Sequence, residues 1–170
     1  MYSPITIANY FIKKYACEDS SLTPMKIIKL TYIAYGWYLA LTQGKQELVS
    51  EKAQAWDLGP VMPTLYRKLK INRGNKVAEP IQLPPGFEEK TITEIDSNFL
   101  DFIWRKYGKF TGMELSAITH TQGTPWSETY PKGTNLEIPN SLIQQHYTTL
   151  MNELIGDNNA VTEKTEHVGG

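Results

Sequence analysis

The sequence has few of the residues that disulfides and metal sites need. Its single cysteine, Cys17, rules out an intramolecular disulfide and any metal site built from several cysteines. Its three histidines, His120, His146 and His167, are far apart and form no His-Glu-x-x-His pair. We therefore predict that the chain binds no metal, and we interpret Cys17 as a buried thiol among the core residues of the first helix.

The sequence also lacks an excess of charge and a long apolar run. Lysine and arginine number 17 and aspartate and glutamate 18, a net charge of −1, so the whole chain has no field that would attract nucleic acid or an anionic membrane. The most apolar stretch contains Lys26 and Lys29, and its charge-free part is too polar for a membrane span. No signal-peptide pattern precedes it. We expect a cytoplasmic protein that does not associate with membranes.

Motifs for nucleotide binding and nucleophilic catalysis are missing as well. The sequence contains neither Gly-x-Ser-x-Gly nor Gly-x-x-x-x-Gly-Lys-Ser/Thr. His120 with Glu114 or Ser116 is the one combination that could support an enzyme, but a helix end and a helix cap explain these residues without catalysis. We predict no cofactor and no enzymatic activity.

The residues that are present predict a helical protein. Ser3-Pro4 and Thr23-Pro24 each combine an N-cap with a proline at the first helical position. The helix predicted over 24–42 is apolar on nearly all sides, which is typical of a helix in the middle of a domain. The buried face of the first helix is predicted to contain Ala8, Phe11, Ile12 and Tyr15.

Further helices follow from caps and apolar spacing. One begins near Pro63, and the next is capped by Asp96 or Ser97 and ends at Gly108. The last is predicted from about Pro139 to Leu154.

Another helix begins at a capping box, in which Thr111 and Glu114 each satisfy the free N–H group of the other. Its inward-facing residues are predicted to be Leu115, Ile118 and Thr119.

Between the helices we predict a small antiparallel β element near 47–57 and 77–94, with a turn at 83–86, because a long structureless loop is unusual inside a compact domain. The fold class is therefore mainly α (α+β), a compact bundle of about six helices around the central apolar helix. Residues 1–155 are predicted to form one domain, and residues 156–170 a flexible C-terminal tail with few apolar residues.

The stretch AWDLGPVMPTLYRKLK raises the question of a binding surface. Gly59-Pro60 predicts a turn, which would leave Trp56 and Tyr66 on either side of a bend. The two rings either belong to the core or form, with Arg67 and Lys70, an aromatic and positive edge of the kind that dominates protein interfaces. We take this edge as the candidate partner-binding surface.

A second candidate is Trp126, in a loop bounded by glycine and proline. It is either a lid over the core or an exposed anchor for a partner.

Basic residues cluster over 67–76, without an acidic residue among them, and an acidic stretch follows. One interpretation is a pair of solvated faces that partly neutralise each other. The other is a positive surface that meets an acidic partner or a phosphate backbone, so a nucleic-acid-binding regulator is the alternative function. The basic residues are Arg67, Lys68, Lys70, Arg73 and Lys76.

Four segments together resemble one family. They are LTPMKIIKLTYIAYGWYLALTQGK, AQAWDLGPVMPTLYRKLK, YGKFTGMELSAITHTQGTPW and SLIQQHY, and they occur in that family's order across residues 4–152. The chain is similar to the Panacea-domain antitoxins, which include SocA-like and phage-associated bacterial proteins. The resemblance implies an antitoxin that neutralises a cognate toxin by direct contact. The SocA branch of the family further implies a proteolytic adaptor, an antitoxin that delivers its toxin to a bacterial protease. It implies no catalytic residue and does not identify the toxin.

Overall fold

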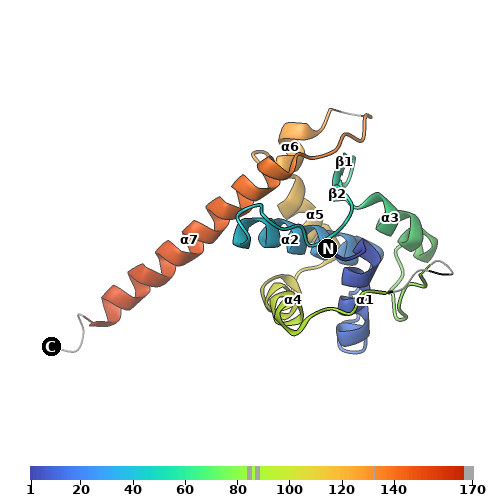
Figure 1. Cartoon of the computed structure of the whole chain (residues 1–170), viewed down its shortest axis with the longest axis horizontal. Helices are drawn as coiled ribbons and strands as arrows, with labels where there is room; N and C mark the ends of the chain where they lie inside the picture. Colours follow the sequence, from blue (N-terminus) through green and yellow to red (C-terminus); the bar gives the residue numbers. More distant parts are fainter. Residues whose placement is uncertain (84–85, 87–88, 132, 167–170) are drawn as a thin grey trace.

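The computed structural model describes residues 1–83, 86, 89–131 and 133–166, and for residues 157–166 the backbone alone. Within these residues the protein is mainly helical and has one small two-stranded sheet, as predicted (Figure 1). The elements are α1 (Pro4–Tyr15), α2 (Pro24–Leu41), β1 (Gln54–Trp56), β2 (Gly59–Val61), α3 (Pro63–Leu69), the short 3-10 helix η1 (Lys70–Asn72), α4 (Glu94–Tyr107), α5 (Gly112–His120), α6 (Pro125–Thr129) and α7 (Asn140–Glu166).

Helix α2 occupies the centre of the molecule, as its all-round apolar sequence predicts. All of its residues from Lys26 to Trp37 are buried, and it contacts α1, α4, α5 and α7 (Figure 1). Gly36 allows the closest of these approaches, because a Cβ atom at this position would lie 2.1 Å from the ring of Tyr147 on α7. No helix in the described part of the chain is long and apolar enough to cross a membrane.

The predicted helix starts are confirmed, α3 at Pro63 and α7 within one residue of Pro139 included, except for that of α4. Ser3, Thr23 and the capping box of Thr111 cap α1, α2 and α5 as expected. Helix α4, however, is capped by Thr93 and not by Asp96 or Ser97. The Thr93 hydroxyl accepts the Asp96 N–H, and the Asp96 carboxylate instead accepts a 2.6 Å hydrogen bond from the hydroxyl of Tyr2.

Two side chains predicted to be buried are exposed. Cys17 is exposed because α1 ends at Tyr15, so the cysteine falls in the turn that follows. Ile118 is 43% exposed because the buried face of α5 contains Leu115, Ser116 and Thr119 and leaves Ile118 to one side.

The sheet lies partly where it was predicted. Both strands belong to one antiparallel hairpin over residues 54–61, whereas residues 77–83 and 89–93 contain no strand. The chain near Ile81 cannot pair as a strand because the amide of Asn9 already binds its N–H and its carbonyl, at 2.7 and 3.0 Å. Residues 84 and 85 of the turn predicted at 83–86 lie outside the described residues.

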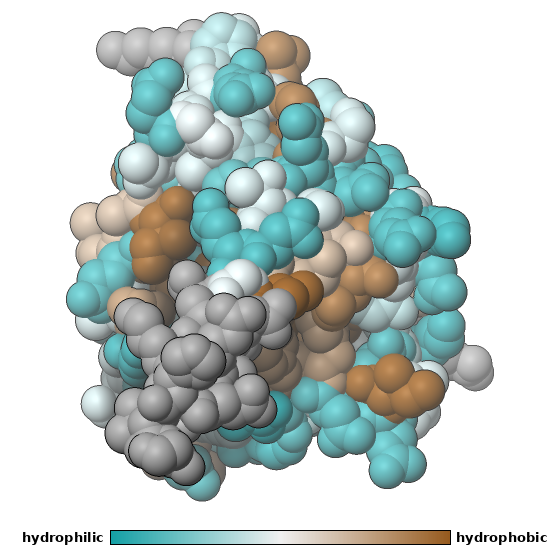
Figure 2. Space-filling view, turned by 90° about the vertical axis from the view of Figure 1, so that its left-hand side faces the viewer, coloured by the Kyte–Doolittle hydropathy of each residue, from teal (hydrophilic) through white to brown (hydrophobic). Residues whose placement is uncertain are grey.

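Helix α7 continues to Glu166, beyond the end predicted at Leu154. In Figure 1 its C-terminal part extends away from the other helices. Figure 2, which views the molecule from this side, shows hydrophobic residues in separate small areas among hydrophilic ones. The division into a domain of residues 1–155 and a flexible tail stays a prediction.

Candidate functional site

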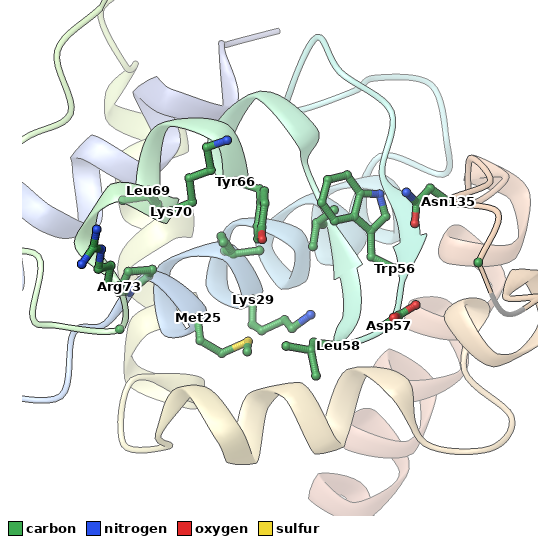
Figure 3. A pocket seen from close by; sticks show the side chains of 15 residues that line it. Met25, Lys29, Trp56, Asp57, Leu58, Tyr66, Leu69, Lys70, Arg73 and Asn135 are labelled. Atoms are coloured by element: carbon green, nitrogen blue, oxygen red, sulfur yellow. The ribbon is translucent and has the colours of Figure 1, made fainter.

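A groove of about 740 Å³ lies between α2, the β1–β2 hairpin and α3 (Figure 3). Met25 and Lys29 of α2 line one side, and Tyr66 of α3 lines the opposite side. Trp56 and Leu58 come from the hairpin. A partner segment could enter this groove, since ligand sites are concave and mostly apolar with a few polar groups.

The hairpin turns at an earlier position than the sequence predicts. Trp56 pairs with Gly59, so the chain reverses at Asp57 and Leu58, and Gly59-Pro60 already begins β2. Gly59 has a φ of +96°, a backbone conformation that residues with a Cβ rarely adopt. A Cβ atom there would also lie 2.7 Å from the ammonium group of Lys29. The predicted reversal is confirmed, but its turn residues lie two positions earlier.

Three side chains anchor the hairpin to the helices behind it through its backbone carbonyl groups. Lys29 of α2 donates to the carbonyl of Pro60 at 3.0 Å. Ser116 of α5 donates to that of Leu58 at 2.8 Å. The indole N–H of Trp126, on α6, donates to the carbonyl of Trp56 at 2.7 Å. Because each carbonyl group binds a different helix, the groove wall is preorganised before any partner arrives.

The groove brings together three of the five residues that the sequence singled out. The rings of Trp56 and Tyr66 meet edge to face with centroids 4.8 Å apart, and Lys70 lines the same groove. Arg67 lies exposed outside the lining, and its guanidinium group donates to the Thr64 hydroxyl at 3.0 Å. Trp126 is half-buried behind the hairpin and does not line the groove. Their roles in partner binding stay predictions.

The groove carries more positive than negative groups. Lys70 and Arg73 are exposed at one end, and Asp57 lies at the other end with Asn135 (Figure 3). Lys29 is fully buried, and this burial lowers the pKa of its ammonium group to about 7.

At the Asp57 end, the carboxylate accepts a 2.6 Å hydrogen bond from the hydroxyl of Tyr130. This bond favours the protonated phenol and raises the pKa of Tyr130. Asp57 is thus already partnered within the chain.

Sequence reasoning missed several groove residues. The sequence predicts Met25 and Lys29 as parts of the central helix and Leu58 as part of a bend. A lysine in a helix that is apolar on all sides is a signal that could have found Lys29, because a buried cation needs a specific partner. Arg73 was predicted only as part of the basic run over 67–76, and Asn135 was not predicted, since only the folded chain brings their segments to the groove.

His120 ends α5 and lies beside Ser116 of the preceding turn. Its Nδ1 atom hydrogen-bonds the carbonyl of Ser116 and lies 3.4 Å from the Ser116 hydroxyl, which donates to the carbonyl of Leu58. Its ring packs edge to face against Trp126, with centroids 5.1 Å apart. These contacts are those of a residue that closes a helix end. Among the residues that the structure describes, no three His, Cys, Asp or Glu side chains are grouped to hold a metal ion.

Comparisons with known proteins place the chain in a family. The family described as "Antitoxin SocA-like, Panacea domain" matches residues 27–127, which include most of α2 and all of the hairpin, α3, α4 and α5. The chain is also 30% identical over 130 residues to Antitoxin SocA of Caulobacter vibrioides (strain NA1000 / CB15N), a match over 71% of this chain. The same match spans 66% of the length of that relative. No solved structure matches. The chain therefore belongs to the SocA-like, Panacea-domain antitoxin family.

Proposed function

We propose that this protein is the antitoxin of a toxin–antitoxin pair and neutralises its toxin by binding it directly. Membership of the SocA-like family supports the antitoxin role. The preformed groove supports a role in binding, because its wall is fixed by three hydrogen bonds to α2, α5 and α6. We propose that the protein acts in the cytoplasm and without catalysis.

The observation that carries the proposed binding surface is the pair of rings at the groove. Trp56 is half-buried and Tyr66 is 38% exposed, so both have surface left to offer a partner. The few residues that dominate binding at protein interfaces are enriched in tryptophan, tyrosine and arginine. We propose that Trp56, Tyr66 and Lys70 contact the toxin, with Arg67 at the border of the surface. Trp126 supports the hairpin from behind and is the least central of the five.

Delivery of the toxin to a bacterial protease is a second step that we propose from the family resemblance. It requires the antitoxin to bind the toxin and the protease at different surfaces. The half-life of the toxin in cells with and without this chain measures it. A half-life that does not change while growth is restored would leave neutralisation by binding alone.

Co-expression tests the proposed function. The reading frame that neighbours this chain is expressed alone and then together with the chain. We expect growth arrest in the first case and growth in the second, with both proteins recovered as one complex. A neighbour that is harmless when expressed alone, or arrest that the chain does not relieve, would contradict the proposal.

The alternative, a nucleic-acid-binding regulator, is favoured by one observation. The side chains of the basic run over 67–76 are exposed, and the ion pairs in the described part of the chain involve other residues. Phosphate binding by such a run weakens steeply as salt increases. An electrophoretic shift assay with DNA and RNA over a salt series decides: retention at low salt that disappears at high salt would support the alternative, and no retention at low salt would exclude it.

A further inference from the structure

The groove is asymmetric along its length. Figure 3 shows Lys70 and Arg73 at one end and Asp57 and Asn135 at the other. Between them lie mostly apolar side chains, among which Leu58 is 61% exposed. An occupant that matches this order has a hydrophobic side chain in its middle and a negative group on one side only.

The positive end has no acidic partner within the described residues. The ion pairs among the described residues join Lys13 to Glu89, Lys14 to Asp101, Lys26 to Asp19 and Lys52 to Glu47. None of them includes a cation of the groove. An arginine beside a lysine with no carboxylate between them is suited to bind a carboxylate, which arginine can hold through two parallel hydrogen bonds.

Lys29 lies beneath the groove. Its side chain is fully buried, and its amine donates to the carbonyl of Pro60. Burying an ammonium group without a counter-ion is costly, and a carboxylate bound nearby in a medium of low dielectric constant lowers that cost. A bound anion therefore favours the protonated form of Lys29, which adds to the preference of the exposed end for an anionic occupant.

The backbone at Arg73 is held in an unusual conformation. Its φ is +48°, in the left-handed region, directly before Gly74 at +86°. A residue with a Cβ in this region costs about 1 kcal/mol or more, and such strain is found at ligand-binding positions more often than elsewhere. Here it ends η1 and places the guanidinium group at the end of the groove.

We infer that the groove binds a peptide segment of the partner in which a hydrophobic side chain is followed or preceded by a carboxylate. This inference rests on the proposed function and names the chemistry of the toxin segment. The hydrophobic side chain packs on Leu58 and Met25 and against the ring of Tyr66, and the carboxylate pairs with Lys70 and Arg73. A phosphate backbone would match the cations but would leave the apolar middle of the groove exposed to water, so a peptide fits better.

A random peptide library displayed on phage tests this inference with the full chain as bait. Three variants are panned in parallel. Lys70→Glu with Arg73→Glu reverses the positive end, and Leu58→Asp adds a negative charge to the apolar middle. Lys68→Glu is the matched control, because Lys68 is exposed on the same helix as Tyr66 but does not line the groove. The melting temperature of each variant is measured to show that it folds.

We expect enriched peptides that contain Asp or Glu within two residues of Trp, Phe, Leu or Met. Their affinity should fall at least about tenfold for the charge-reversed pair and for Leu58→Asp, and should be unchanged for Lys68→Glu. The inference is overturned if nothing is enriched, if the enriched peptides lack acidic residues, or if the charge-reversed pair binds them equally well. Binding of a labelled oligonucleotide that the charge reversal abolishes, with no peptide enriched, would overturn it in favour of a phosphate ligand.

The failure of this inference is distinguishable from failure of the proposed function. If the charge-reversed pair and Leu58→Asp still restore growth in the co-expression experiment, the chain neutralises its toxin through another surface. The antitoxin role then stands, whereas the toxin contacts proposed at the groove and this inference are wrong. If the unmodified chain does not restore growth, the proposed function fails first.

Discussion

The ammonium group of Lys29 donates a hydrogen bond to the carbonyl oxygen of Pro60 across 3.0 Å, from a side chain that solvent does not reach. This bond ties the central helix to the hairpin that walls the groove. Burial lowers the pKa of the ammonium group to about 7, whereas the unfolded chain has a lysine pKa of 10.5. The two values make the stability of the protein depend on pH.

Stability should increase with pH from about pH 7 to about pH 9, by up to about 1.4 kcal/mol per pH unit. In this range the unfolded chain binds a proton at Lys29 that the folded chain has released, so higher pH favours the folded state. Urea unfolding at several pH values measures the slope. Lys29→Met should flatten it, and an equal slope in both proteins would show that Lys29 is not the group responsible.

Gly36→Ala should destabilise the protein by about 1–3 kcal/mol, because the new methyl group would collide with the ring of Tyr147 between α2 and α7. Gly156→Ala, on α7, is the control. Nothing lies within 4 Å of the added Cβ atom there, and alanine favours a helix, so it should stabilise by up to about 1 kcal/mol. Thermal unfolding compares the two, and equal effects would mean that the helices are not in close contact at Gly36.

Arg73→Gly should stabilise the fold by up to about 1 kcal/mol and weaken partner binding. Glycine adopts the φ of +48° without strain, but it removes the guanidinium group from the groove. Gly74→Ala is the matched opposite, since its φ of +86° disfavours alanine although no atom obstructs the added Cβ atom. Melting temperatures that move in the same direction for both variants would refute the assignment of strain.

Trp126→Phe should loosen the hairpin while leaving the groove lining intact. The substitution removes the 2.7 Å hydrogen bond to the carbonyl of Trp56, at a cost of about 1 kcal/mol. Hydrogen exchange at the amide of Ala55, which donates to the carbonyl of Leu136 at 2.8 Å, should become faster, and exchange within α4 should not change. Unaltered exchange in the hairpin would mean that Trp126 does not position it.

The helical part of the fold could be predicted because its signals are local. The caps at Ser3, Thr23 and Thr111 each depend on a few neighbouring residues, and the central place of α2 follows from its all-round apolar surface. Local signals failed where a distant partner competes. Asp96 looks like a cap in sequence, but Tyr2 holds its carboxylate, and Asn9 keeps the chain near Ile81 out of a sheet.

The candidate site could be predicted only in part for the same reason. Trp56, Tyr66 and Lys70 lie close together in sequence and carry the chemistry of an interface, so the pattern alone pointed to them. Their position around one groove depends on a hairpin that α2, α5 and α6 hold in place. The place of Lys29 beneath that hairpin follows from the fold, although a lysine in an otherwise apolar helix was already a signal in the sequence.

Direct binding of the toxin through the groove is the central claim, and one measurement tests it most directly. The affinity of the purified full chain for the product of the neighbouring reading frame, the proposed toxin, is measured by calorimetry for the unmodified protein, Leu58→Asp and Ile95→Asp. Ile95 is 81% exposed on α4 and lies outside the groove lining, so it controls for an apolar-to-acidic change elsewhere. We predict that Leu58→Asp weakens binding at least about tenfold and that Ile95→Asp leaves it unchanged. Equal affinity of all three proteins for the toxin would contradict the account.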